Sequence, residues 1–396
     1  MIIFRICILS TLLFSLSSNI NASDDLMDVG RAVSIDVMLE NAVRRTLISG
    51  AVVAVGNHAG LLYGTAQGTL YPDSNAPVLS DRTLFDTASL TKVIATAPAI
   101  MKLLEQGKIS LLDPLTRWFP EFEGTGREEI TILNLLTHTS GMDDVEIAND
   151  DPINSLIENT ILHSNGTPPG NRFRYADINF ILLGEIVKRA SLNNLDKFCS
   201  ENIYAPVGMA DTTFLPQADS IVIAPTAGQN KVLKAGVVQD LNARRLGGVA
   251  GHAGLFSTAS DLTRFATMIL NNGKYNGTQI FNERVITQMT SPYFYHKGKI
   301  IRGLGWDINS PFSSPRGNYF SDMSFGHTGY SGSSIWIDPE QDLFVILLTV
   351  RLDYTNIRQF NQLRSDISSL AVSIFSNPRI AAEITNSIKT PETLIP

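Results

Sequence analysis

The sequence predicts an α/β (α+β) fold: an antiparallel sheet flanked by helices, with an inserted, mainly α-helical lobe. Two β-rich hairpins carry this prediction, one at residues 51–68 and one at residues 331–350. A helical pattern lies outside each hairpin, at residues 33–48 and 357–375. We therefore expect both ends of the chain to share one antiparallel sheet, and the residues between them to form the inserted lobe.

Each terminal element has its own signal. Apolar side chains recur at helical spacing within residues 33–48, at Ile35, Met38, Ala42 and Val43. Gly50 follows as a stop signal. The first hairpin is expected to turn at residues 57–60 and the second at residues 338–342. Between the hairpins, helical patterns alternate with Gly/Pro-rich connections, and no internal repeat is evident.

These elements give one domain at residues 30–380. Its α/β lobe is predicted at about residues 30–88 and 300–380, and its helical lobe at about residues 89–299. The composition fits a globular protein of 396 residues, with 44% hydrophobic and 17% charged residues. A formal net charge of -7 argues against a nucleic-acid partner, which would need a basic stripe.

Residues 1–22 are predicted to be a secretory signal peptide. Arg5 supplies a basic region, an apolar stretch follows at residues 6–16, and small residues precede a cut near Ala22. We therefore expect an exported protein, secreted or periplasmic. The alternative is an uncleaved membrane anchor, for which the apolar run is short. Once the signal is removed, Cys199 is the only cysteine, so no intramolecular disulfide is expected.

The stretch "FDTASLTKVIATAPAIMKLLEQGK" places Ser89 three residues before Lys92, at the start of a helix predicted over residues 90–106. Gly107 follows where a left-handed helix cap belongs. The N-terminus of a helix favours developing negative charge, and Lys92 lies one turn further on the same face. A lysine takes the proton of a serine only when burial or nearby positive charge lowers its pKa. Taken alone, the pair is better explained by Ser89 as a helix cap.

Further sequence motifs, in the right order along the chain, favour a catalytic role for Ser89 and Lys92. From residue 33 to residue 375 the sequence resembles the serine hydrolases of the penicillin-recognising superfamily, especially the branch of class C β-lactamases, D-alanyl-D-alanine carboxypeptidases and related esterases. Ser89 and Lys92 match the first motif, Ser-x-x-Lys. The stretch "ITILNLLTHTSGM" at residues 130–142 also looks like this family. The resemblance implies a β-lactamase/transpeptidase-like fold, an acyl-enzyme on Ser89 and no cofactor.

The second motif, Tyr-x-Asn, is matched with a departure. In "FRYADINFILLGEIV" the tyrosine is Tyr175, and Asp177 stands in place of the asparagine. By resemblance, Tyr175 moves protons between Ser89 and the leaving group, together with Lys92. A carboxylate accepts hydrogen bonds but does not donate them, and it favours the charged form of Lys92, so we expect Tyr175 to carry more of the base role. Two other readings stay open: Asp177 is protonated, or it is simply salt-bridged to Lys92. The literal match at residues 354–356 is rejected because it follows the third motif.

The third motif, Lys-Thr-Gly in many members, is His327, Thr328 and Gly329 here. It lies at the start of a predicted strand, where a substrate can bind along the edge. By resemblance, the backbone N–H groups of Tyr330 and Ser89 form an oxyanion hole. His327 would form a polar wall or, when protonated, a positive one. The alternative is a histidine merely hydrogen-bonded beside a turn.

The remaining histidines do not show the spacing of a metal site, and no metal is expected. Structural roles are expected for them, and they are His58, His138, His163, His252 and His296. His252 is the best candidate for substrate contact among them, because the glycines of "GGVAGHAGLFS" indicate a tight loop near the cleft.

The sequence thus predicts an exported serine hydrolase that acts through a Ser89 acyl-enzyme on D-alanyl peptides or small esters. Hydrolysis of β-lactams is the alternative with the same chemistry. A non-catalytic penicillin-binding or scaffolding protein is the alternative from another class, and Asp177 keeps it open. The expected partner is a peptide or small-molecule substrate, with no nucleic acid, and with a membrane only if the signal stays uncleaved.

Overall fold

The computed structural model describes residues 22–376, apart from residues 74, 164–166, 218–220, 229–230 and 298. The predicted signal peptide therefore lies outside the described residues, except for Ala22. None of the helices in the described part of the chain combines the length and apolar character that crossing a bilayer needs.

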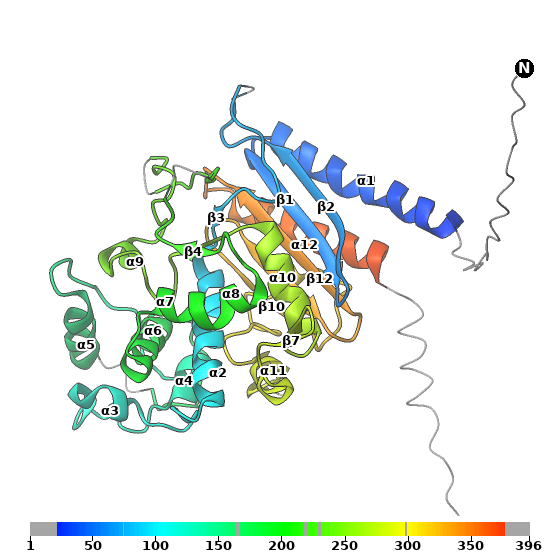
Figure 1. Ribbon diagram of the computed structural model, residues 1–396. Coiled ribbons are helices and arrows are strands. Elements are labelled where there is room, and N and C mark those ends of the chain that lie inside the picture. Colours follow the sequence, from blue (N-terminus) through cyan, green and yellow to red (C-terminus); the bar gives the residue numbers. More distant parts are fainter. Residues whose placement is uncertain are drawn as a thin grey trace, which may run out of the picture.

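A five-stranded antiparallel sheet joins the two ends of the chain, in the order β10-β11-β12-β1-β2 (Figure 1). Its strands are β1 (Gly50–Asn57), β2 (Gly60–Gly68), β10 (Phe325–Thr328), β11 (Ser334–Asp338) and β12 (Leu343–Val350). Both predicted hairpins are present, as the pairs β1–β2 and β11–β12. Because β1 also pairs with β12, with Gly50 opposite Val350, the prediction that both chain ends share one sheet is confirmed.

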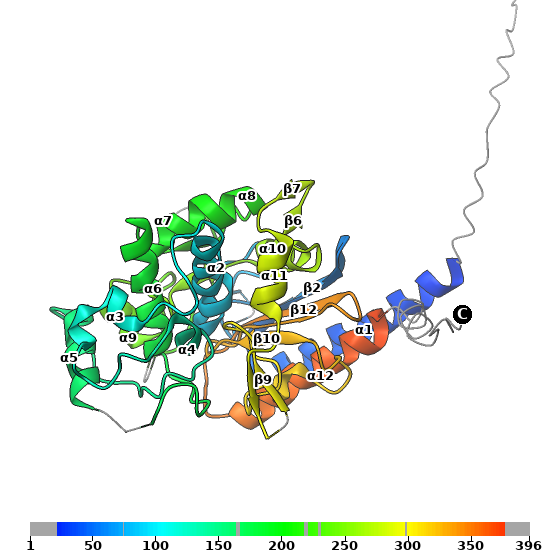
Figure 2. The same cartoon turned by 90° about the horizontal axis from the view of Figure 1, so that it is seen from below.

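Two helices from opposite ends of the chain cover one face of this sheet. They are α1 (Ala22–Arg44) and α12 (Ile357–Phe375), which lie side by side (Figures 1 and 2). Their apolar side chains and those of the sheet form one buried cluster that includes Leu39, Trp336 and Ile367. The bounds of α12 are those predicted. In contrast, α1 begins earlier than residue 33 and ends before residue 48.

The opposite face of the sheet packs against α10 (Ala259–Leu270), which contacts β1 and β12 (Figure 1). Behind it, α2 (Ala97–Glu105) and α6 (Ile178–Ser191) pack together at the centre of the helical region. α10 lies within the residues predicted as the helical lobe, and its buried Leu262 and Phe265 belong to the core that continues onto the sheet. Sequence periodicity shows that a helix has an apolar face, not which surface that face covers.

Smaller elements complete the described fold. The helices are α3 (Leu115–Trp118), α4 (Ile132–Leu136), α5 (Pro152–Leu162), α7 (Leu195–Cys199), α8 (Ala205–Val207), α9 (Leu241–Arg245) and α11 (Glu283–Thr290). A small sheet has the order β3-β5-β4, from β3 (Phe85–Asp86), β5 (Leu255–Ser257) and β4 (Thr213–Phe214). Two hairpins are β6 (Lys274–Tyr275) with β7 (Thr278–Gln279), and β8 (Phe294–His296) with β9 (Lys299–Arg302). The exact limits of the two lobes remain predictions.

Candidate active site

Ser89 lies directly after β3, in a single turn of 3-10 helix at Ala88–Leu90. A π-helical turn at Lys92–Thr96 and then α2 follow, so the segment predicted as one helix changes its winding twice. Ser89 is not a helix cap: Thr87 stands at the N-cap of the 3-10 turn, and Ser89 Oγ instead accepts a hydrogen bond of 3.0 Å from Lys92 Nζ. The structure therefore contradicts the cap interpretation.

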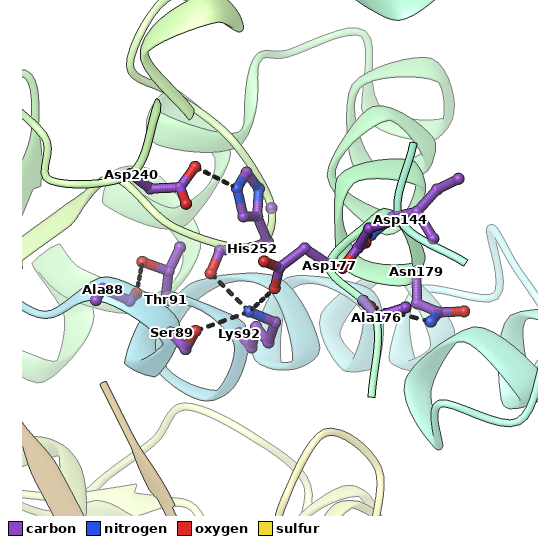
Figure 3. Close-up of polar contacts among 12 residues, drawn as sticks. Ala88, Ser89, Thr91, Lys92, Asp144, Ala176, Asp177, Asn179, Asp240 and His252 are labelled. Atoms are coloured by element: carbon purple, nitrogen blue, oxygen red, sulfur yellow. Dashed lines mark hydrogen bonds and ion pairs between the residues drawn. The ribbon is translucent and has the colours of Figure 1, made fainter. Parts of the chain in front are cut away.

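The Lys92 side chain is fully buried, and its ammonium group has three partners (Figure 3). Besides Ser89 Oγ, it donates to the backbone oxygen of His252 at 3.0 Å and pairs with Asp177 Oδ1 at 2.7 Å. Burial alone would lower the pKa of Lys92, but the Asp177 carboxylate and the Tyr175 phenol outweigh it and raise the pKa above its usual value. Lys92 is therefore an ammonium ion that donates to Ser89, and not a ready base.

Asp177 is the residue before α6, yet its side chain points at Lys92 and does not cap that helix (Figure 3). Asp144 takes over part of the capping role, because its Oδ1 accepts the N–H of Ile178 at 2.9 Å. Burial would raise the pKa of Asp177, but the ammonium of Lys92 holds it below its usual value. Of the readings that the sequence left open, the structure thus favours the salt bridge over a protonated Asp177.

Tyr175 lies beside this ion pair, with its ring centroid 5.2 Å from Lys92 Nζ. The ring stacks on the buried His138, at a centroid distance of 4.5 Å and an interplanar angle of 25°. Burial, together with the charge of Arg302, lowers the pKa of His138 well below its usual value, so this histidine is neutral. Only a structural role is expected for His138 from the sequence, and nothing there indicates that it supports Tyr175.

Tyr354, the tyrosine of the rejected match, packs against Tyr330, at 4.8 Å between ring centroids.

His327 and Thr328 are the last two residues of β10, an edge strand of the large sheet, so the motif lies at the end of a strand and not at the predicted start. His327 is 4% exposed, and its Nδ1 lies 2.9 Å from the backbone oxygen of Thr328, which fits a neutral ring with the proton on Nδ1. Burial and the charge of Arg302 lower the pKa of His327 well below its usual value. The structure therefore favours a polar wall over the positive one that the sequence left open.

Gly329 brings the third motif against the segment that carries Ser89. A Cβ atom at Gly329 would lie 2.3 Å from the backbone oxygen of Thr87, so no side chain fits there. Tyr330 follows with an exposed ring, and it lines the same cavity as Ser89. All three motifs thus meet at Ser89, although they are far apart in the sequence.

His252 and Asp240 add a second layer behind Lys92. His252 Nε2 lies 2.8 Å from Asp240 Oδ1, and the backbone oxygen of His252 is the acceptor for Lys92 (Figure 3). Burial would raise the pKa of Asp240, but the bond to His252 and neighbouring groups hold it at about 2. Asp177, Asp240 and His252 each offer a ligand atom within 4.8 Å of the others, and the Lys92 ammonium already places a cation against this group. Asp240 was missed, because no motif marks it.

Two cavities flank Ser89, with volumes of about 660 and 420 Å³. Ser89, Tyr175 and Tyr330 line both of them. The larger one is bordered by Asp177, Asp240 and His252. The smaller one is bordered by the His327 motif and by Arg302, Arg351 and Arg364. A still larger cavity, of about 820 Å³, lies between β2 and α10 and has none of the motif residues in its wall.

This geometry suits acyl transfer: a hydroxyl beside an ammonium, a carboxylate behind it, a phenol at the side and a strand edge opposite. The Beta-lactamase family model matches residues 35–363. The chain belongs to the Beta-lactamase family. It is 30% identical over 301 residues to a protein of Escherichia coli (strain K12) named "Putative D-alanyl-D-alanine carboxypeptidase", which covers 67% of this chain and 69% of that protein.

Two solved structures share the fold. A class C beta-lactamase superposes with a TM-score of 0.72 at 18% identity, covering 91% of this chain and 99% of its own. EstCE1, a hydrolase with promiscuous acyltransferase activity, superposes with a TM-score of 0.69 at 20% identity, covering 87% of this chain and all of its own. The expected family and β-lactamase-like fold are therefore confirmed. The chain is a member of a family of hydrolases. At sequence identities of 18 and 20%, the two solved structures support the fold and not a particular activity.

Proposed function

We propose that this protein is an exported serine hydrolase that removes the C-terminal residue of D-alanyl peptides through a Ser89 acyl-enzyme. The observation that carries this proposal is the chain of contacts from Ser89 Oγ to Lys92 Nζ and on to Asp177, at 3.0 and 2.7 Å. In this chain of contacts Lys92 can accept the proton of Ser89, and the Asp177 carboxylate can accept a proton from Lys92. The name of the Escherichia coli relative supports the substrate class.

The proton of Ser89 moves in a relay. As Ser89 Oγ attacks the carbonyl carbon, its proton passes to Lys92 Nζ while Lys92 passes one of its own protons to Asp177. Lys92 thus remains an ammonium, which its raised pKa requires, and the negative charge moves from Asp177 to the carbonyl oxygen. The N–H groups of Ser89 and Tyr330 hold this oxyanion, and each such donor contributes about 3 to 4 kcal/mol to a typical acyl transfer.

Collapse of the tetrahedral intermediate then breaks the C–N bond. The departing nitrogen takes the proton of the Tyr175 phenol, which lies beside Lys92. Asp177 returns its proton through Lys92 to Tyr175, which restores the ion pair. Water then attacks the acyl-enzyme and its proton passes through Lys92 to Asp177; as the C–O bond breaks, a proton returns from Asp177 through Lys92 to Ser89 Oγ.

The smaller cavity favours substrates that carry a carboxylate beyond the scissile bond. Arg351 is 1% exposed, Arg364 is 4% exposed, and neither forms an ion pair with a carboxylate among the described residues. The Nη2 atom of Arg351 has no hydrogen-bond partner there either. A buried guanidinium is costly without an anion, and it binds carboxylates in a bidentate manner. A terminal D-alanine would supply that anion next to Thr328.

The test compares two peptides that differ only at the C-terminus. An N-acylated peptide ending in D-Ala-D-Ala is supplied as the free acid and as the C-terminal amide, and release of the last residue is measured. We expect the acid to be cleaved at least about 10-fold faster, since a charged hydrogen bond contributes about 1.5 to 3 kcal/mol. Ser89→Ala should abolish release, and Ser373→Ala, at an exposed position of α12, should not. Equal cleavage of acid and amide would reject the proposed carboxylate site, and no cleavage of either would reject the peptidase.

Hydrolysis of β-lactams is the second candidate. A penicillin also carries a carboxylate, so the same two arginines would accept it, whereas a small neutral ester gains nothing from them. Rapid consumption of a penicillin by the wild type, with no release of D-alanine from the peptide, would favour this candidate. Stable binding without turnover of either substrate would favour a non-catalytic penicillin-binding protein.

Export is proposed from residues 1–22, which carry the signal pattern. Expression of the full chain in a Gram-negative host, followed by N-terminal sequencing of the periplasmic and membrane fractions, tests it. A mature protein that begins near residue 23 in the periplasm supports export with cleavage. An intact N-terminus in the membrane fraction would support the anchor, and an intact N-terminus in the cytoplasm would reject export.

A further inference from the structure

Asp86 is a buried carboxylate three residues before Ser89. It is 2% exposed and forms no ion pair with a cation among the described residues. Its two oxygens instead accept two backbone N–H groups. Oδ1 accepts the N–H of Ala88 at 2.8 Å, and Oδ2 accepts the N–H of Gln239 at 2.6 Å.

The first of these bonds holds an unusual turn. Ala88 has a φ of +47°, in the left-handed region that residues with a Cβ atom rarely adopt. Ala88 directly precedes Ser89, so its conformation sets the direction in which the serine side chain leaves the backbone. Such strained residues persist only where their surroundings hold them, and the Asp86 carboxylate is the contact that holds the Ala88 N–H.

The other contacts of Asp86 reach the rest of the site. Gln239 is the neighbour of Asp240, which binds the ring of His252. The backbone oxygen of Asp86 accepts a hydrogen bond of 2.6 Å from Ser331 Oγ, in the turn that follows Gly329. Asp86 thus connects the Ser89 turn with the loop that carries Asp240 and with the third motif.

We propose that Asp86 is a positioning residue of this active site, whose ionised carboxylate fixes the left-handed turn at Ala88 and thereby the direction of Ser89. The inference rests on the proposed role of Ser89 as nucleophile. The two N–H donors each meet one oxygen of the carboxylate, and the ionised form offers two strong acceptors without a donor of its own. An asparagine would turn its NH2 group toward one of the two N–H groups, and protonation of Asp86 would weaken the acceptor on one oxygen.

The charge of Asp86 is not there for stability. Burial is the main reason why the pKa of Asp86 is raised to about 6, and the charge of Asp240 raises it as well. The N–H groups of Gln239 and Ala88 and the charge of Arg244 lower this pKa. The charge of Asp86 also raises the pKa of Tyr354. Because the folded pKa lies above the unfolded value, folding favours the protonated form, and stability due to this group falls as the pH rises from about 4 to 6. The ionised form therefore costs stability at neutral pH, which fits a role in function.

The test measures how fast a fluorophosphonate probe labels Ser89, a reaction that does not depend on the natural substrate. In the wild type we expect the labelling rate to fall as the pH drops below about 6. In Asp86→Asn we expect the rate at pH 7.5 to be about 10- to 100-fold lower, as for small misplacements of reacting groups, and the fall near pH 6 to be absent. Asp261→Asn is the matched control, because Asp261 is also buried and also accepts a backbone N–H, from Asp211, but lies on α10.

A second variant separates positioning from mere loss of structure. Glycine adopts a positive φ without strain, so Ala88→Gly in the Asp86→Asn background should restore at least about 3-fold of the lost rate. Circular dichroism at each pH checks that the variants are folded. Wild-type rate and pH profile in Asp86→Asn would overturn the proposal, and so would a uniform loss that keeps the fall near pH 6. A wild type that labels at Ser89 but releases no D-alanine would reject only the peptidase, whereas one that does not label at Ser89 would overturn both.

Discussion

The carboxylate of Asp177 lies 2.7 Å from the ammonium of Lys92, which in turn lies 3.0 Å from Ser89 Oγ. The lysine of the Ser-x-x-Lys motif is therefore neutralised by a counter-ion and not held as a free amine. In the proposed mechanism the acceptor for the serine proton is consequently the ion pair as a whole. An asparagine at residue 177 could not play that part.

Asp177→Asn should move the acid limb of the Ser89 labelling rate to higher pH. Without the carboxylate, burial lowers the pKa of Lys92, and the variant reacts only where Lys92 has lost its proton. In the wild type, by contrast, we expect the labelling rate to fall only where Asp86 becomes protonated, near pH 6. Labelling rates from pH 5 to 10 measure this shift, and a limb that stays near pH 6 in the variant would argue against the relay.

Asp177→Ala should reduce the free energy of unfolding by about 3 kcal/mol at pH 7, because it leaves a buried ammonium without its anion. The Asp177 pKa is lowered and the Lys92 pKa is raised, so the pair stabilises the fold between about pH 4 and pH 10. The loss should therefore shrink below pH 4, as Asp177 becomes protonated in the wild type. Denaturant unfolding at pH 7 and pH 3 measures both values, and an equal loss at the two pH values would contradict this.

Arg351→Gln should raise KM for the free-acid peptide by about 10- to 100-fold with little change for the amide, since it removes the charged partner of the carboxylate. The guanidinium also stacks on the ring of Phe360, at 4.3 Å, so a modest loss of stability is expected as well. Steady-state kinetics with both peptides separate the two effects. Arg284→Gln, on the exposed side of α11, serves as the control. A parallel rise in KM for acid and amide would place the carboxylate elsewhere.

Gly329→Ala should lower the Ser89 labelling rate by about 100-fold while leaving a folded protein, because its Cβ would press on the backbone oxygen of Thr87 from 2.3 Å. Gly64→Ala on β2 is the matched control, since its Cβ would meet its nearest neighbour at an ordinary 3.5 Å. Labelling and thermal unfolding are measured for both. A Gly329→Ala variant with the wild-type rate would show that the third motif need not approach Ser89 so closely.

Much of the fold could be predicted because its signals are local. The period of the apolar residues predicted the observed bounds of α12, and the turn residues predicted the positions of both hairpins of the large sheet. The helix after Ser89 was predicted with uniform winding, since periodicity does not distinguish 3-10 and π turns from α-helix. The first helix was predicted to residue 48, but Thr46 has a φ of +56°, and the helix ends at Arg44.

The site was predictable where a motif marks it, and not where the chain merely folds onto it. Ser89, Lys92 and Tyr175 were found by their motifs, and the structure brings them together. Asp86 contacts Gln239 across 153 residues of sequence, and Asp240 reaches the surroundings of Lys92 only through His252, so no local pattern could reveal either residue. The state of Asp177 stayed open for a similar reason: its charge depends on a distance to Lys92 that only the fold defines.

The most direct test of the central claim is intact-mass spectrometry of the protein mixed with a penicillin, followed over time and combined with peptide mapping. We expect a covalent adduct on Ser89 that is absent from Ser89→Ala. Its lifetime then separates a peptidase-like site, with a long-lived adduct, from a β-lactamase, with a transient one. If the adduct maps to another residue, or if Ser89→Ala consumes penicillin or peptide at the wild-type rate, Ser89 is not the nucleophile and the proposed mechanism is wrong.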